Sequence, residues 1–121
     1  MRARLPKILV TGGAGFIGSA FIRLLCKKGY HPIIVDKLTY AADLARLAAV
    51  EGRFKFYRKD ICDKKKIEKI FAIEEPWAVV HFAAESHVDR SIKDSLPFIK
   101  TNFNGTQVLI EAARKYPVKK F

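Results

Sequence analysis

The sequence predicts an α/β fold in which helices cover both faces of a doubly wound parallel sheet. Short apolar runs alternate with segments whose apolar residues recur at helical spacing, which is the pattern of successive βαβ units. The lengths of the intervening segments suit the right-handed crossovers that join parallel strands. With 121 residues, the chain has the size of a single domain.

The first strand and the helix after it are the most clearly marked elements. Residues 7–11 (KILVT) form a short apolar run that ends at glycine, as a buried parallel strand does. Gly29 is expected to end the helix that follows. The apolar residues that recur at helical spacing in this helix are Phe16, Ile17, Ala20, Phe21, Leu24 and Leu25.

The next three elements repeat the alternation. Residues 31–36 (HPIIVD) predict a second strand, with Pro32 near its start, where a missing N–H is tolerated. Residues 41–50 (AADLARLAAV) predict a weaker helix, which ends near Gly52. Residues 54–58 (FKFYR) alternate in polarity and predict a third strand.

A further helix and strand follow. Asp63 is expected to cap a helix that carries Ile67, Ile70 and Phe71 on its apolar face and ends before Pro76. Residues 78–84 (AVVHFAA) predict a fourth, buried strand.

The last predicted elements are a long helix and the beginning of a strand. Asp94 or Ser95 is expected to cap the helix, with Pro97 in its first turn. Residues 118–121 (VKKF) open a fifth strand that the sequence does not complete, so the predicted order 3-2-1-4-5 is truncated and the fourth strand keeps an open edge. The expected inner face of the helix consists of Ile99, Phe103, Thr106, Ile110 and Ala113.

The glycine turn after the first strand indicates a phosphate site. Gly12, Gly15 and Gly18 lie three residues apart between a strand and a helix, which is the context of a Rossmann-like dinucleotide site. Gly12 permits a tight turn, Gly15 lets a pyrophosphate reach the backbone, and Gly18 lets the helix pack closely. The N-terminus of the helix would add partial positive charge. The alternative is a glycine turn that binds nothing.

Acidic residues at two later strand ends support a dinucleotide. Asp36 stands 18 residues after Gly18, where a carboxylate binds the ribose hydroxyls and repels a 2′-phosphate, which favours NAD over NADP. The neighbouring Lys37 leaves NADP open. Asp60 follows the third strand, where it would meet the adenine edge. Each acidic residue is also compatible with a simple turn.

Composition limits the other function classes. The net charge of +11 is spread over several helix ends, and no stacking aromatic residues accompany the basic runs, which argues against nucleic acid. No apolar run approaches the length of a membrane span. Cys26 and Cys62 are isolated and lack metal-ligand spacing, so we expect free thiols and no metal site. These observations favour a soluble, cytoplasmic protein.

Longer motifs resemble a known family. The segments VTGGAGFIGS, VDKLTYA, DICD, HFAAESHVDRSI and FIKTNFNGTQVLIEAARKY together resemble the extended short-chain dehydrogenase/reductases. AAESHVDRSI joined to DKLTYA resembles, more narrowly, the dTDP-glucose 4,6-dehydratases. The resemblance runs from residue 7 to residue 121. It implies that residues 1–121 are the NAD-binding Rossmann portion, without the C-terminal substrate domain.

The resemblance implies how NAD would be bound. The backbone N–H groups that face the pyrophosphate belong to Phe16 and Ile17. The adenosine ribose would be surrounded by Asp36, Lys37, Leu38 and Thr39, and the adenine would be held by Asp60 and Ile61. The residues that would line the nicotinamide side are Phe82, Ala83, Ala84 and Glu85.

The resemblance also implies contacts near the sugar nucleotide. Ser86 would lie where the cofactor meets dTDP-glucose or a similar sugar nucleotide, with His87 beside the substrate and Thr101 facing the cofactor. We expect His81 to be a core or edge histidine rather than a catalytic one. The family usually reads TYAGN where this chain reads TYAAD, so Ala42 puts contacts beyond Thr39 in question.

The family's catalytic residues are not found in this sequence. The family oxidises C4 of the sugar, eliminates water across C5 and C6 and returns the hydride to C6, using a Thr-Asp-Glu run and a Tyr-x-x-x-Lys pair that follow the fifth strand. Tyr116 and Lys120 have the second spacing, but Pro117 between them breaks a helix. We therefore expect NAD binding without turnover, and a homodimeric full-length protein.

Two other interpretations remain open. The chain could be part of a related sugar-nucleotide epimerase or decarboxylase, which residues after Phe121 would distinguish. It could also be a non-catalytic NAD-binding module.

Overall fold

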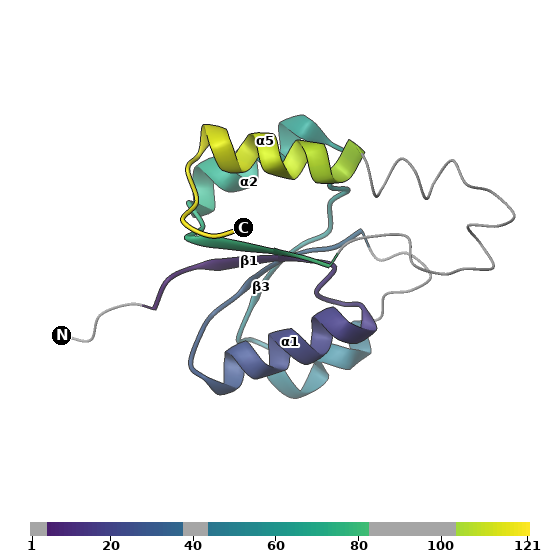
Figure 1. Cartoon of the computed structure of the whole chain (residues 1–121). Helices are drawn as coiled ribbons and strands as arrows, with labels where there is room; N and C mark the ends of the chain where they lie inside the picture. The colour runs from purple at the N-terminus through teal and green to yellow at the C-terminus, as the bar shows by residue number, and fades with distance from the viewer. Residues whose placement is uncertain (1–4, 38–43, 83–103) are drawn as a thin grey trace, which may run out of the picture.

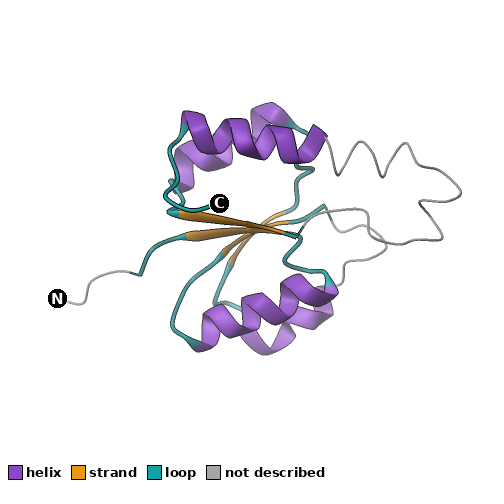
Figure 2. Ribbon diagram, in the orientation of Figure 1, coloured by secondary structure: helices purple, strands orange, loops and turns teal. Residues whose placement is uncertain are grey.

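Four parallel strands form the sheet of the computed structural model, which describes residues 5–37, 44–82 and 104–121. The strand order is β3-β2-β1-β4, as predicted for the first four strands (Figures 1 and 2). The strands are β1 (Ile8–Thr11), β2 (Ile33–Val35), β3 (Lys55–Tyr57) and β4 (Ala78–His81).

The register brings the carboxyl ends of three strands to one level. Thr11 of β1 pairs with Val35 of β2 on one side and with His81 of β4 on the other. Residues that follow these positions therefore emerge at the same edge of the sheet, where ligands bind in open α/β sheets.

Two layers of helices enclose the sheet (Figure 1). The helix α1 (Phe16–Lys27) and the 3₁₀-helix η1 (Leu44–Val50) cover one face. The helices α2 (Lys64–Glu74) and α5 (Thr106–Lys115) cover the other. The helix predicted over residues 41–50 is thus a 3₁₀-helix where it is described, and residues 38–43 lie outside the described residues.

The core has two halves because side chains alternate along each strand. Leu9 and Val35 face α2 and α5, whereas Val10 and Ile34 face α1 and η1. All four are fully buried. Apolar side chains on both faces explain why these strands read as short continuous apolar runs.

The buried face of α1 contains only part of the apolar pattern seen in the sequence. Phe16 is 80% exposed and Ile17 is 67% exposed. The buried side of the helix contains the small residues Gly18 and Ser19 next to the sheet. The larger buried residues of the same side are Ile22, Leu25 and Cys26.

The predicted inner face of α5 is wrong at Ile110, whose side chain is 46% exposed. Leu109, one residue earlier, is fully buried and packs in the core with Ala112. The helix is therefore rotated by about one residue from the predicted phase, because its inner face must fit α2 as well as the sheet. Residues 94–103, with the predicted cap and first turn, lie outside the described residues.

Several predicted element ends are confirmed. The Asp63 carboxylate caps α2 by accepting the Lys66 N–H at 3.3 Å. Gly29 follows α1 with φ of +90°, a left-handed conformation suited to glycine. Lys120 forms a single parallel bridge to Ala78 of β4, where the fifth strand was expected to begin.

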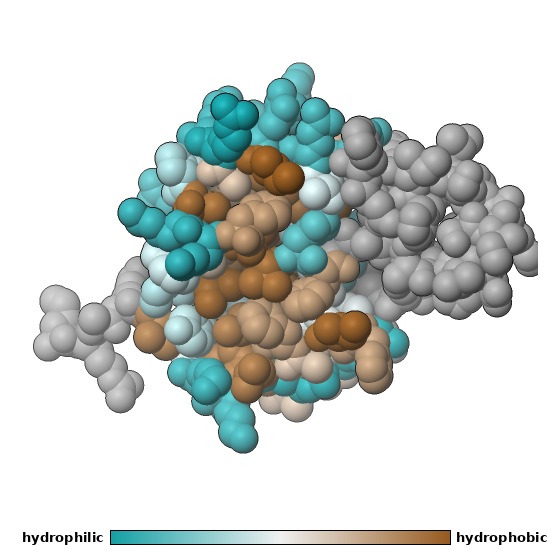
Figure 3. All heavy atoms as spheres, viewed as in Figure 1, coloured by the Kyte–Doolittle hydropathy of each residue, from teal (hydrophilic) through white to brown (hydrophobic). Residues whose placement is uncertain are grey.

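Apolar side chains gather on the face of the molecule that carries β4 (Figure 3). Among the described residues, β4 meets only the Lys120 bridge on its outer side. Trp77, which precedes β4, is 41% exposed, and Phe121 is 56% exposed. This edge therefore presents both backbone groups and apolar surface.

An ionic cluster closes the amino-terminal edge of the sheet. The Glu74 side chain is 5% exposed and lies 2.6 Å from the Lys55 ammonium and 3.5 Å from that of Lys7. The Tyr57 hydroxyl donates to Glu74 Oε2, the same oxygen that Lys55 contacts, whereas Lys7 lies near Oε1. Burial acts to raise the pKa of Glu74, but the hydrogen bonds from Lys55 and Tyr57 and the nearby charges outweigh it and lower the pKa.

We predict that Glu74→Ala lowers the free energy of unfolding by about 1–2 kcal/mol at pH 7, because the Tyr57 hydroxyl loses its acceptor. The loss stays small because Lys7 and Lys55 are about half exposed and remain hydrated without Glu74. The folded-state pKa of Glu74 is depressed, so its contribution is complete above about pH 4.5 and is lost as the pH falls below it. Urea unfolding at pH 7 and at pH 3 measures both effects. The exposed Glu51→Ala is the control, and equal losses in the two variants would contradict the prediction.

Candidate functional site

The glycine turn follows β1 at the carboxyl edge of the sheet. Gly12 has φ of +71°, which favours glycine, and its N–H donates to the Val35 carbonyl at 2.9 Å. The Gly15 N–H donates to the Gly12 carbonyl at 3.1 Å and closes the turn. The turn is therefore fixed to the end of β2 before α1 begins at Phe16.

The three predicted glycines have different surroundings. A Cβ placed on Gly18 would lie 2.0 Å from the Gly12 carbonyl oxygen, so only glycine lets α1 pack on the turn. A Cβ on Gly15 would meet only that oxygen, at 3.3 Å. This contact is tight but much less severe than the one at Gly18. The sequence did not single out Gly13, where a Cβ would lie 2.6 Å from Ile34 Cγ2.

The N-terminus of α1 lies at Gly15. Gly15 is the N-cap residue, and no side chain caps the helix or places an acidic group in its first turn. The first N–H groups of a helix lack intrahelical partners and attract anions. The exposed residues Phe16 and Ile17 supply two of these backbone groups. This geometry fits a phosphate-bearing ligand.

Asp36 comes to the same turn from the end of β2. Its Oδ2 accepts the Ala14 N–H at 3.0 Å, and the residue is 7% exposed. The carboxylate is therefore anchored next to Gly15, where the sequence predicts a ribose contact. Ala14 is itself fully buried.

The two residues predicted for the adenosine end lie near each other. Lys37 Nζ is 3.8 Å from Asp60 Oδ2, and both side chains are 39% exposed. Asp60 Oδ1 also accepts the Cys62 N–H at 2.9 Å. Ile61 is 4% exposed and belongs to the core, so only its backbone could take the predicted role. Gly105, which the sequence did not single out, packs on Ile61: a Cβ there would lie 2.4 Å from Ile61 Cδ1.

The end of β4 completes the described part of the site. The Phe82 N–H donates to the Thr11 carbonyl at 2.9 Å, and the Phe82 ring lies 5.7 Å from the Phe21 ring of α1, between centroids. His81 bridges two threonines: Nδ1 lies 2.6 Å from Thr11 Oγ1, and Nε2 lies 2.9 Å from Thr106 Oγ1.

His81 has the structural role that the sequence predicts. Desolvation by burial lowers the pKa of His81, so its ring is neutral at pH 7. Both ring nitrogens are engaged with hydroxyls of neighbouring elements.

The remaining predicted site residues lie outside the described residues. They are Leu38, Thr39, Ala83, Ala84, Glu85, Ser86, His87 and Thr101.

The described residues offer no metal centre and no membrane span. They hold no group of three or more histidine, cysteine or acidic residues that could bind a metal ion. Cys26 and Cys62 are free thiols, as predicted. Within the same residues, no helix has the length and apolar character needed to cross a membrane.

A hollow of about 870 Å³ lies at the opposite edge of the sheet, near the starts of β2 and β3. It is lined by the ionic cluster around Glu74 and by the end of α1. Its lysines neutralise a buried carboxylate and stand at a helix C-terminus, where cations are favourable. The hollow is therefore separate from the glycine turn, and its charges have a structural explanation.

Two arginines near the turn were also not singled out from the sequence. Arg46 of η1 donates from Nη1 to the Ala14 carbonyl at 3.3 Å. Arg23 of α1 donates from Nη1 to the Arg46 carbonyl at 2.9 Å. No local motif marks either residue, because their partners at Ala14 and Arg46 are more than 20 residues away in the sequence.

Comparison with known proteins identifies relatives over nearly the whole chain. The model of the GDP-mannose 4,6 dehydratase family matches residues 9–121. A dTDP-glucose 4,6-dehydratase of Escherichia coli is 55% identical over 113 residues, which are 91% of this chain and 31% of that protein. The chain thus spans about a third of the length of the curated relatives it matches.

Solved structures agree with this assignment. A dTDP-glucose 4,6-dehydratase of Streptomyces venezuelae with NAD bound has a TM-score of 0.87 and 44% identity, covering 93% of this chain and 37% of that one. A UDP-glucose 4-epimerase of Thermotoga maritima with UDP-glucose has a TM-score of 0.88 and 41% identity, covering 95% and 36%. Both confirm the Rossmann-like fold.

We predict that alanine costs much more stability at Gly18 than at Gly15. The added methyl of Gly18→Ala overlaps the Gly12 carbonyl, which should cost about 3 kcal/mol or more of stability. In Gly15→Ala the methyl lies 3.3 Å from the same oxygen, a milder contact that should cost about 1 kcal/mol. Chemical denaturation of both variants measures the difference. A similar loss at the two positions would disprove the contact between α1 and the turn.

Proposed function

The chain belongs to the GDP-mannose 4,6 dehydratase family, and we propose that it binds NAD as the cofactor portion of a dTDP-glucose 4,6-dehydratase. Residues 1–121 then form the dinucleotide domain. The substrate is dTDP-glucose or a similar sugar nucleotide, and the full-length protein is a homodimer. NAD-bound dehydratases among the structural relatives support the cofactor.

One observation carries the cofactor proposal: the N-terminus of α1 has no side-chain cap and no acidic residue in its first turn, and its N-cap residue is Gly15. The N–H groups of Phe16 and Ile17 bind the pyrophosphate, whose negative charge suits the helix N-terminus. Asp36, held by the Ala14 N–H, accepts hydrogen bonds from the adenosine ribose. When bound, NAD accepts a hydride from the substrate and can return it.

The other cofactor contacts follow from the family resemblance. Lys37, Leu38 and Thr39 surround the ribose. Asp60 and the backbone of Ile61 hold the adenine. Phe82, Ala83, Ala84 and Glu85 line the nicotinamide side, and Thr101 faces the cofactor.

The substrate side follows from the same resemblance. Ser86 lies between the cofactor and the sugar, and His87 lies near the sugar nucleotide. Neither is assigned catalysis. Residues of the Thr-Asp-Glu and Tyr-x-x-x-Lys types would perform the proton transfers.

The similarity to a UDP-glucose 4-epimerase supports a second candidate. An epimerase shares the cofactor site and the first oxidation but has no need to eliminate water. Among the solved structures the two classes are similarly close, at 44% identity for the Streptomyces venezuelae dehydratase and 41% for the epimerase. The curated relatives at 51–55% identity are named as dTDP-glucose 4,6-dehydratases, which favours dehydration. A Thr-Asp-Glu run after the fifth strand would identify a dehydratase.

We predict that the chain binds NAD and that Gly15→Val abolishes this binding, because the branched side chain fills the pyrophosphate space. Isothermal titration calorimetry with NAD measures both. Ala20→Val, at an exposed position of the same helix, is the control and should bind normally. Unchanged NAD affinity in Gly15→Val would refute the phosphate turn.

We also predict that the 121-residue chain does not convert dTDP-glucose to its 4-keto-6-deoxy product. The absorbance of the keto sugar in alkali measures this product. A full-length dehydratase is the positive control. Product formation by this chain alone would show that its own residues suffice for catalysis.

A further inference from the structure

Two side chains hold the backbone of the glycine turn on either side of Ala14. Asp36 accepts the Ala14 N–H at 3.0 Å, and Arg46 donates to the Ala14 carbonyl at 3.3 Å. Asp36 follows β2, whereas Arg46 belongs to the 3₁₀-helix η1. Ala14 itself is fully buried. The turn that leads into α1 is therefore anchored through its backbone by two elements that are distant in sequence.

The bond from Arg46 fixes the peptide unit between Ala14 and Gly15. The N–H of this unit donates to the Gly12 carbonyl at 3.1 Å, while its carbonyl accepts from Arg46. Among the described residues, Arg46 is the only hydrogen-bond partner of this carbonyl. Gly13 and Gly15 flank Ala14, and glycine permits a wide range of backbone angles. The anchoring bonds, rather than steric limits at the glycines, therefore decide how the unit is turned.

The orientation of this unit matters to an anion at the N-terminus of α1. The first N–H groups of a helix attract an anion, whereas a carbonyl oxygen beside them carries partial negative charge and repels it. The Gly15 carbonyl is occupied by the Ser19 N–H at 2.9 Å. The Ala14 carbonyl is occupied by Arg46. Both carbonyls that precede α1 are thus bonded within the protein.

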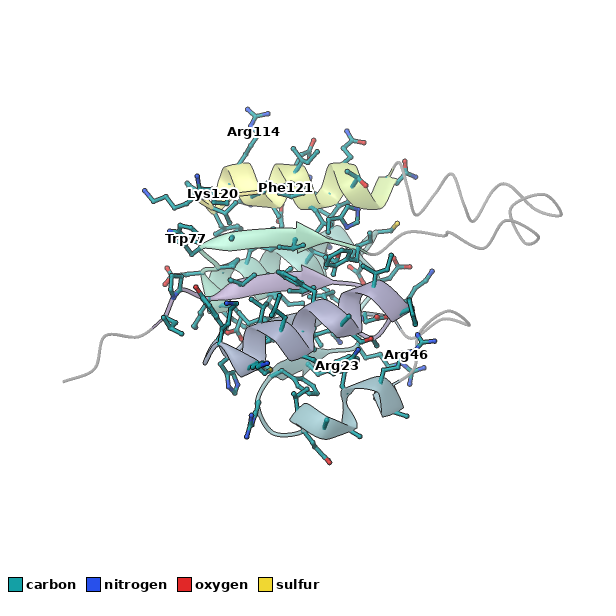
Figure 4. All side chains as sticks on the ribbon, turned by 60° about the horizontal axis from the view of Figure 1, so that its bottom comes forward. Arg23, Arg46, Trp77, Arg114, Lys120 and Phe121 are labelled. Carbon is teal, nitrogen blue, oxygen red and sulfur yellow. The ribbon has the colours of Figure 1, made fainter. Side chains whose placement is uncertain are left out.

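The fold also holds Arg46 in place. The guanidinium of Arg23 on α1 donates to the Arg46 backbone carbonyl at 2.9 Å. The helices α1 and η1 lie side by side, and Figure 4 labels both arginines at this junction. The side chain that bonds to the turn therefore starts from a backbone that is tied to the same helix.

We propose that Arg46 is a positioning residue of the dinucleotide site, which acts through the Ala14 carbonyl to keep the N–H groups at the start of α1 open to a pyrophosphate. The inference rests on the proposed binding of NAD at the glycine turn. In this role Arg46 does not touch the ligand. Without its bond the peptide unit takes several orientations, and the apparent affinity falls with the fraction of chains in the correct one.

Titration of the chain with NAD and with adenosine tests the proposal, because adenosine has the ribose and the adenine but no phosphate. Arg46→Gln should weaken NAD about fivefold, the effect of one hydrogen bond, and change adenosine less than about twofold. Arg46→Lys keeps a donor for the carbonyl and should stay within about twofold of the unmodified chain for both ligands. Arg114→Gln, which removes the same charge from the exposed side of α5, should change neither (Figure 4).

Salt separates positioning from charge attraction. The ratio of NAD affinities between the unmodified chain and Arg46→Gln should be the same in about 0.05 M and about 0.5 M sodium chloride, because ions screen the attraction of a ligand by an exposed charge but not a hydrogen bond within the turn. A ratio that falls to about one at the higher concentration would overturn the proposal.

Two further outcomes would also overturn it: equal weakening of NAD and adenosine, or unchanged NAD affinity in Arg46→Gln. Circular dichroism at the titration temperature verifies that each variant is folded, so that lost stability is not mistaken for lost affinity. If Arg46→Gln does not fold, Arg23→Gln removes the bond that holds the Arg46 backbone and should weaken NAD about twofold but not adenosine. Unchanged NAD affinity there would count equally against the proposal. Failure of the unmodified chain to bind NAD would instead refute the proposed function.

Discussion

The contact between Gly18 and the Gly12 carbonyl is the constraint on which the rest of the site depends. It brings α1 so close to the end of β1 that no side chain fits between them. Gly13 likewise lets the turn backbone approach the Ile34 side chain of β2. Together they set where the helix N-terminus points. A helix displaced outward by one methyl group would aim its free N–H groups away from the strand ends, where the other predicted contacts lie.

The two edges of the sheet use charge in different ways. At the amino-terminal edge, Glu74 is neutralised by Lys55, Lys7 and the Tyr57 hydroxyl. At the carboxyl edge, charged groups bond to the backbone of the turn itself. The first arrangement satisfies a buried carboxylate, whereas the second fixes the turn that precedes the N-terminus of α1. This difference explains why the hollow at the amino-terminal edge is not the candidate site.

Much of this fold follows from local sequence. Strand order, the ends of α1 and α2, and the glycine turn were predictable because apolar runs, caps and glycines act over a few neighbouring residues. Helix phase was less predictable: Ile110 and Leu109 are equally apolar, and only packing against α2 selects Leu109. The roles of Gly13, Gly105 and Arg46 depend on Ile34, Ile61 and Ala14, partners at least 20 residues away. Contacts of that kind leave no periodic signal in one sequence.

The two hydrogen bonds of His81 at the carboxyl edge of the sheet must run in the same direction. A neutral imidazole has one N–H, so one of its two threonine neighbours must donate its hydroxyl hydrogen to the ring while the other accepts from it. The chain Thr11–His81–Thr106 is therefore polarised from one end to the other, and the reverse sense requires the other ring tautomer with both hydroxyl hydrogens turned. Protonation of the ring removes this choice, because both nitrogens then donate. The end of β1 and the start of α5 are thus joined by a small electric dipole whose sense depends on the tautomer.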